Sequence, residues 1–189
     1  MKPHEARSLK EIVKCCNGGA KPKFIFFWGH TPPKSGEINK ACFRQWYNAP
    51  FKIDNVVYPT TEHYMMASKA RLFRDQEAFD KIIFASSPGA AKAFGREVKN
   101  FDEKKWIENR FKIVSKGNFE KFNQNPNLRN FLLNTKNRVL VEASPKDTIW
   151  GIGMAESDEG ADQPVKWRGL NILGFALMEA REQILLSSN

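Results

Sequence analysis

The sequence predicts a mainly helical α+β protein that forms a single compact domain with a few short strands. Its 189 residues are 41% hydrophobic and 12% aromatic, a composition typical of a folded chain with a core and not of a disordered one. Helix-capping residues recur through the middle of the chain, whereas apolar runs of strand length are few. These two observations favour helices as the main structural element.

The N-terminal segment, residues 1–22, is polar and contains the helix-breaking pair Gly18-Gly19. We expect it to be an extension with at most a frayed helix, followed by the domain proper over residues 23–189. No internal repeat or linker divides the rest of the chain.

Short apolar or β-branched runs predict strands at residues 24–28, 51–53, 56–58 and 139–141. The second and third strands flank Asp54-Asn55, which predicts a tight hairpin turn. Proline and glycine at residues 32, 33 and 36 predict a loop over residues 30–40.

Each predicted helix begins at a side chain that can accept a hydrogen bond from the first turn. In the helix that begins at Asp102, an interruption is expected near Gly117. The last helix carries an apolar face, with leucine, alanine and isoleucine at helical spacing. The caps are Thr60 or Thr61 (helix to about residue 73), Asp75 (to about 85), Ser87 with Pro88 (to about 99), Asp102, Asn125 with Pro126 (to about 133), and Asn171.

The charge balance favours a phosphate-bearing ligand. Thirty Lys and Arg against 21 Asp and Glu give a formal net charge of +9. The basic residues between positions 99 and 121 alternate with acids, which is more typical of a solvated helix face than of a nucleic-acid track. No stretch is long enough to cross a bilayer and no secretory leader is evident, so we expect an intracellular protein without a membrane partner.

Cysteine and histidine spacing predicts neither a disulfide framework nor a metal site. The three cysteines include the adjacent pair Cys15-Cys16 and no CxxC motif. The three histidines are scattered, and no HExxH or Walker motif occurs. We expect reduced thiols, no metal and no cofactor.

Three blocks of sequence, residues 59–70 (PTTEHYMMASKA), 141–153 (VEASPKDTIWGIG) and 167–174 (WRGLNILG), resemble the signature of the NADAR superfamily. The resemblance extends over about two thirds of the chain and includes two acids, a lysine and several tryptophans in the family's order. It implies a NADAR-type domain with N-glycosidase activity.

Glu62 and Lys69 can face one pocket. Glu62 lies in the first turn of its helix, where the macrodipole stabilises a carboxylate. Lys69, seven residues on, is only about 20° around the axis from it, with Met66 between them as an apolar floor. Spacing alone favours a solvated surface pair, but the resemblance implies that both are catalytic.

Asp147 and Trp106 each have two interpretations. Asp147 follows Ser144-Pro145 in a loop, where a turn-forming aspartate would be the first expectation, and a helical tryptophan is usually part of the core. The resemblance implies that Asp147 and Trp106 belong to the active site.

The remaining candidates would bind substrate. Arginine can hold a phosphate with two parallel hydrogen bonds, although an exposed arginine without a partner is the simpler interpretation. Aromatic side chains in a long loop over residues 28–47 can stack on a purine or belong to the core, and glycines allow close approach of a ligand or of neighbouring backbone. These candidates are Trp28, Gly29, Trp46, Tyr47, Arg96, Trp150, Gly151 and Arg168.

The resemblance implies hydrolysis of an N-glycosidic bond, with ADP-ribosylated guanine in DNA, RNA or a nucleotide as the expected substrate and ADP-ribose as the product. In that branch of the family Lys69 would attack C1 of the opened ribose. One alternative is hydrolysis of phosphoribosylamino-pyrimidine intermediates of riboflavin biosynthesis. Another is a non-catalytic module that binds ADP-ribose or NAD, which would not need Glu62, Lys69 and Asp147 together.

Overall fold

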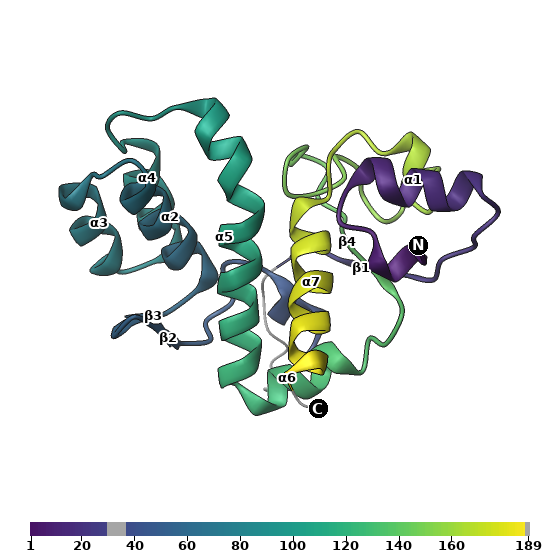
Figure 1. Ribbon diagram of the computed structural model, residues 1–189, viewed down its shortest axis with the longest axis horizontal. Coiled ribbons are helices and arrows are strands. Elements are labelled where there is room, and N and C mark those ends of the chain that lie inside the picture. Colours follow the sequence, from purple (N-terminus) through teal and green to yellow (C-terminus); the bar gives the residue numbers. More distant parts are fainter. Residues whose placement is uncertain (30–36, 188–189) are drawn as a thin grey trace. The chain divides into compact units, whose positions relative to one another are not determined.

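A computed structural model describes residues 1–29 and 37–187 of the chain (Figure 1). The chain divides into two compact units, each described by itself below. Unit 1 comprises Met1–Arg44 and Pro126–Asn189, and unit 2 comprises Gln45–Asn125. Helices predominate over a few short strands in the described part, so the predicted α+β, mainly helical class is confirmed. The loop predicted over residues 30–40 lies mostly outside the described residues.

Unit 1 contains a parallel pair of strands in which Phe24 aligns with Val139 and Phe27 with Glu142. The helix α7 packs against β4, and its apolar face supplies much of the core of this unit. The elements of unit 1 are η1 (Pro3–Glu5), α1 (Leu9–Asn17), β1 (Phe24–Phe27), η2 (Lys40–Phe43), α6 (Pro126–Leu133), β4 (Val139–Glu142), η3 (Pro164–Lys166) and α7 (Ile172–Leu186).

Asn171 connects α7 to β4 through its side chain. The residue occupies the predicted N-cap position, but its side chain makes no capping bond. Its Oδ1 instead accepts a hydrogen bond from the backbone N–H of Glu142 at 3.0 Å, and its Nδ2 donates to the carbonyl of Leu140 at 2.9 Å. A Cβ at Gly174 would lie 2.1 Å from the Leu140 carbonyl oxygen, so only glycine permits this approach.

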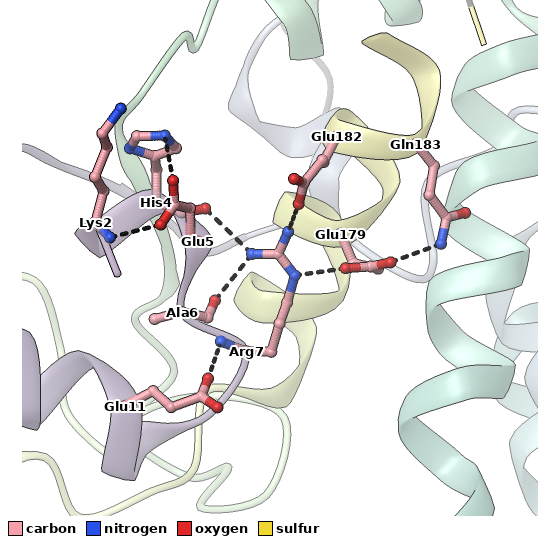
Figure 2. A network of polar contacts seen from close by, with 9 residues as sticks. All are labelled: Lys2, His4, Glu5, Ala6, Arg7, Glu11, Glu179, Glu182 and Gln183. Atoms are coloured by element: carbon pink, nitrogen blue, oxygen red, sulfur yellow. Dashed lines mark hydrogen bonds and ion pairs between the residues drawn. The ribbon is translucent and has the colours of Figure 1, made fainter. Parts of the chain in front are cut away.

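Arg7 ties the N-terminal residues to α7 (Figure 2). Its guanidinium forms ion pairs with Glu179, at 2.5 Å from Nε, and with Glu182. It also donates to the carbonyl of His4 at 3.1 Å. Ile12 of α1 is fully buried. Residues 1–22 therefore contribute an ordered helix to unit 1, where the sequence suggested at most a frayed one.

Unit 2 consists of a β-hairpin and four helices. The hairpin turn is formed by Asp54 and Asn55, both with positive φ (49° and 65°), as its sequence predicts. The elements of unit 2 are β2 (Phe51–Ile53), β3 (Val56–Tyr58), α2 (Thr61–Leu72), α3 (Gln76–Ile83), α4 (Pro88–Arg96) and α5 (Glu103–Gln124).

The helix α2 is the centre of unit 2 and contacts α3, α4 and α5. It packs closely against two of these neighbours through glycines. A Cβ at Gly95 in α4 would lie 2.1 Å from the Met66 sulfur, and a Cβ at Gly117 in α5 would lie 2.5 Å from the Tyr64 ring. The predicted break near Gly117 is wrong: α5 continues through it, because the glycine there accommodates Tyr64.

Thr60 and His63 fix the start of α2. Thr60 is the cap, since its hydroxyl accepts the backbone N–H of His63 at 3.4 Å. The His63 ring is buried, with Nδ1 2.8 Å from the Thr60 hydroxyl and Nε2 3.1 Å from the carbonyl of Ala85. Burial lowers the pKa of His63, and the hydrogen bond to Ala85 opposes this effect only in part. The lowered pKa favours the neutral ring.

All three cysteines are free thiols, with Cys15 and Cys42 buried. Among the described residues, none of the helices combines the length and apolar character needed to cross a bilayer.

His63 makes folding stability depend on pH. Because the folded-state pKa lies below the ordinary value of 6.5, the unfolded chain binds the proton more readily, and stability is lost as pH falls below about 6.5. His63→Gln removes this titration, so its free energy of unfolding should fall less than that of the wild type between about pH 7.5 and about pH 5. Urea unfolding at several pH values measures the difference. Equal slopes for His63→Gln and wild type would contradict the assignment.

Gly95 is required for the approach of α4 to α2. Gly95→Ala should lower the free energy of unfolding by about 1–3 kcal/mol, because its methyl group meets the side chain of Met66. Gly89→Ala in the same helix is the matched control: its methyl group would be 3.6 Å from Trp46, an ordinary contact, and it should be neutral or stabilising.

The pair Gly95→Ala and Met66→Ala tests the contact itself. If the two side chains compete for one space, the double variant should be more stable than the sum of the single effects predicts, by about 1 kcal/mol or more. Additive effects in chemical denaturation would show that the cost of Gly95→Ala arises elsewhere.

Candidate functional site

Glu62 is a buried carboxylate in the first turn of α2. It is 3% exposed, and its backbone N–H donates to the carbonyl of Gln45 at 3.0 Å. The hydroxyl of Thr61 donates to the same carbonyl at 3.1 Å. These hydrogen bonds to Gln45 therefore hold Glu62 where the positive end of the helix dipole stabilises negative charge.

Gln45, which the sequence did not single out, is itself held in the interior. Its side-chain oxygen accepts a hydrogen bond from Asn118 Nδ2 at 3.2 Å, and both side chains are buried. Asn118 also donates to the carbonyl of Val114 one turn earlier in α5. The first turn of α2 is thus braced by a buried amide pair. The only sequence signal for this pair is Asn118, a polar residue at an otherwise core-facing position of a long helix.

Lys69 extends from the other end of α2 into a half-buried position. Its Nζ donates to the carbonyl of Gly95 at 2.7 Å and lies 4.3 Å from the ring centre of Phe101 and 5.9 Å from that of Trp106. Burial lowers the pKa of Lys69. No carboxylate pairs with it in the part of the chain that the structure describes.

The structure therefore brings together two of the four predicted catalytic residues, Lys69 and Trp106. Glu62 shares α2 with Lys69 but forms no ion pair with it. The buried Met66, expected to be an apolar floor between them, fills the space in front of Gly95 and so helps to set the carbonyl that Lys69 contacts.

Three further candidates belong to unit 2. Trp46 is 36% exposed, with its ring edge close to Gly89 at the start of α4. The Tyr47 ring lies 5.5 Å from the buried Nζ of Lys121. Arg96, at the end of α4, is exposed and has no polar partner among residues 1–29 and 37–187. Trp46 and Arg96 are thus accessible to a ligand, whereas Tyr47 is partly committed to packing.

In unit 1 the candidates gather at one edge of the small sheet. Because β1 and β4 are parallel, the segments that follow them leave from the same edge, and the N–H of Ala143 donates to the carbonyl of Phe27 at 3.0 Å. Trp28 follows β1 and is 59% exposed. Gly29 has a φ of 80°, a left-handed conformation that favours glycine.

Asp147 is held by a turn that uses only one of its carboxylate oxygens. Oδ1 accepts the backbone N–H groups of Ile149 at 2.9 Å and Trp150 at 2.7 Å. The turn-forming interpretation is therefore correct for this oxygen. Oδ2 has no hydrogen-bond partner among the described residues, so the turn orients the carboxylate and leaves one oxygen available to a ligand.

The loop of Asp147 is fastened to the segment that precedes α7. Backbone N–H groups of Arg168, Leu170 and Asn171 donate to the carbonyls of residues 152, 148 and 151 at 2.9, 2.9 and 3.1 Å. A Cβ at Gly151 would lie 2.7 Å from the Glu142 carbonyl oxygen. Gly151 is thus explained by packing of the loop on its neighbours, the second of the two roles expected for it.

Arg168 and Trp150 differ in accessibility. The Arg168 side chain is exposed and has no polar partner within the described part of the chain. Trp150 is half-buried. Unit 2 contributes Arg96 and unit 1 contributes Arg168, and neither guanidinium has a polar partner among the residues that the structure describes.

Glu142 is a buried acid that sequence reasoning did not single out. It ends β4, is 4% exposed, and its Oε1 lies 3.4 Å from Nε of Arg44. The sequence signal for Glu142 was its position directly after the apolar run Val139–Val141, inside one of the family blocks. Within the described residues, no three His, Cys, Asp or Glu side chains converge as a metal site would require.

Comparison with known proteins agrees with this arrangement of motifs. The family model of the NADAR domain matches residues 26–185 of the chain. The chain is 41% identical over 166 residues to N-glycosidase R617 of Acanthamoeba polyphaga mimivirus, covering 85% of this chain and 96% of that protein. It is 35% identical over 144 residues to N-glycosidase YbiA of Escherichia coli (strain K12), covering 76% and 79%.

The NMR structure of E. coli YbiA resembles the chain with a TM-score of 0.69 at 29% identity, covering 89% of each chain. A third relative, the chloroplastic riboflavin biosynthesis protein PYRR of Zea mays, is 37% identical over 139 residues, covering 70% of this chain and 20% of that protein. The predicted enzyme class, a hydrolase acting on N-glycosyl bonds, is confirmed by these N-glycosidase relatives. With its motifs, its fold and a family match over most of its length, the chain belongs to the NADAR domain family.

Proposed function

We propose that this N-glycosidase removes ADP-ribose from ADP-ribosylated guanine, in nucleic acid or in a nucleotide. The observation that carries the proposal is the environment of Lys69. A half-buried lysine with a lowered pKa and no carboxylate partner in the described residues is suited to act as a nucleophile. The sequence had suggested that an ionised Glu62 would oppose deprotonation of Lys69, but the two residues form no ion pair.

Lys69 would act covalently on the opened ribose. The neutral amine adds to C1 of the opened sugar, its protons are transferred to the guanine nitrogen, the bond from C1 to that nitrogen breaks, and an imine remains between Lys69 and the sugar. Water then hydrolyses the imine and releases ADP-ribose. The carbonyl of Gly95, 2.7 Å from Nζ, orients the amine.

Glu62 and Asp147 supply the two carboxylates that the bond cleavage needs. Positive charge develops on the anomeric carbon as the bond breaks, and a fixed carboxylate stabilises it. Glu62, held by the N-terminal turn of α2, is assigned to this role. The leaving nitrogen requires a proton, and Asp147, through its available Oδ2, is assigned to that transfer.

The accessible aromatic and cationic side chains fit a substrate that carries both a base and phosphates. Trp28 and Trp46 are exposed and able to stack on a purine. Arg96 and Arg168 have guanidinium groups without a polar partner in the described residues, and such groups suit a pyrophosphate. The net charge of +9 favours approach of such a polyanion.

Hydrolysis of phosphoribosylamino-pyrimidine intermediates is the second candidate function. It is favoured by the similarity to the maize protein named for riboflavin biosynthesis. Both reactions cleave a bond between nitrogen and an anomeric carbon, so Glu62 and Asp147 would serve either. A non-catalytic ADP-ribose or NAD reader is disfavoured, because it would not require both acids and Lys69.

The substrate assignment is tested by comparing three substrates at equal concentration: an ADP-ribosylated guanine oligonucleotide, ADP-ribosyl-guanosine and the riboflavin intermediate. We expect the first two to be cleaved faster than the riboflavin intermediate, with release of ADP-ribose that chromatography measures. Glu62→Gln should slow that release by at least about a hundredfold, because it keeps the shape of the side chain and removes its charge. Glu108→Gln, at an exposed position of α5, is the matched control and should be fully active. Faster cleavage of the riboflavin intermediate would favour the second function instead.

The covalent role of Lys69 is tested by trapping. Borohydride added during turnover should reduce the imine and leave a stable ADP-ribose adduct on the peptide that contains Lys69, detected by mass spectrometry. Lys69→Arg should lose both the adduct and, by about a hundredfold or more, the turnover, whereas Lys116→Arg, at an exposed position of α5, should keep both. Loss of activity in Lys69→Arg without any adduct in the wild type would mean that the lysine acts only through its charge.

A further inference from the structure

A cavity lies within unit 1, in a region that none of the predicted site residues lines. Its volume is about 430 Å³, within the size range of small-molecule sites. Its walls come from β1, from Phe43 of η2, and from the end of α6 with the turn that follows it. All of the described residues that line the cavity belong to unit 1.

The walls of the cavity are aromatic and firmly supported. Phe24 and Phe26 project from one face of β1 with ring centres 5.7 Å apart, and Phe43 and Phe131 lie 5.4 Å apart. Trp167 supports Phe24 edge-on, at 6.0 Å between ring centres. Flat, rigid apolar surfaces of this kind suit a planar aromatic ring.

The cavity also carries exposed cations. Lys40 and Arg138 line it, and neither forms an ion pair with an acid in the described part of the chain. One acid, Glu156, lines it as well and is exposed. Among the described lining residues the two cations outnumber the acid, so the lining favours a negatively charged ligand.

A buried arginine adds to this positive charge. Arg181 of α7 is 3% exposed, and its Nη1 donates at 2.6 Å to the hydroxyl of Thr135, which lines the cavity, and at 3.0 Å to the carbonyl of Arg138. Burial lowers the pKa of Arg181 to about 10, so the guanidinium remains charged at neutral pH. No carboxylate forms an ion pair with it among the described residues.

We propose that this cavity is a second ligand site, which binds a nucleoside monophosphate with its base between the phenylalanines and its phosphate at Lys40 and Arg138. The paired aromatic walls would stack on the base. The two side-chain cations would hold the phosphate through charge-assisted hydrogen bonds. Glu156 and Asn134 provide an acceptor and an amide for the polar edge of the base. This site is independent of the hydrolysis proposed above.

Adenosine 5′-monophosphate is the probe, with adenosine and inorganic phosphate as its two halves. Calorimetry should show that the nucleotide binds more tightly than either half. Lys40→Ala/Arg138→Ala should weaken its binding by at least about tenfold, because two contacts to a charged group are lost. Both side chains are exposed, so the variant should fold. Lys10→Ala/Lys14→Ala, at two exposed positions of α1 outside the cavity, removes the same number of charges, is the control for net charge and should bind as the wild type does.

The location is checked with Arg96→Ala/Arg168→Ala, which alters the predicted phosphate-binding arginines and should leave binding of the nucleotide at the cavity unchanged. In NMR spectra the nucleotide should shift the amide signals of Phe26 and Thr135. The proposal is overturned if the nucleotide does not bind, if inorganic phosphate binds as tightly as the nucleotide, or if Arg96→Ala/Arg168→Ala removes binding while Lys40→Ala/Arg138→Ala keeps it.

Discussion

Close packing of helices against α2 is the constraint on which unit 2 depends. This helix is buried on nearly all sides, and its neighbours approach it through glycines because any larger residue at Gly95 or Gly117 would overlap Met66 or Tyr64. The same contact places the Gly95 carbonyl next to Lys69. The packing around α2 therefore also positions the groups of the candidate site, because the helix that forms the core of unit 2 carries Glu62 and Lys69.

Unit 1 relies on an equivalent constraint, close approach of backbone to backbone. Gly174 lies against the Leu140 carbonyl, and Gly169 lies where a Cβ would be 2.3 Å from the Gly151 carbonyl oxygen. Asn171 then supplies both a donor and an acceptor to β4, much as an additional strand would. The loop that holds Asp147 is therefore supported by hydrogen bonds along its length. This allows one carboxylate oxygen to maintain the turn while the other remains available.

The ionisable groups of the candidate site are held mainly by backbone groups and by the core. Lys69 contacts a carbonyl and aromatic rings, and Asp147 accepts two backbone N–H groups. Groups fixed in this way need not break an ion pair before they meet a substrate. Such preorganisation is the arrangement expected for a site that stabilises developing charge. The surface pair of Glu77 and Lys81, one helical turn apart, shows the contrasting pattern of charges that neutralise each other.

The sequence by itself determined the local elements and their order, because capping side chains, hairpin turns and apolar periodicity act over a few residues. Thr60, Asp75, Ser87 and Asp102 all cap helices as predicted, and the family blocks identified the enzyme class. Only the tertiary structure decided features that depend on residues distant in sequence. Gly117 continues a helix because Tyr64 occupies the adjacent space, and Asn171 bonds a strand that lies about thirty residues earlier in the chain. The lowered pKa of Lys69 likewise depends on burial, which local sequence does not specify.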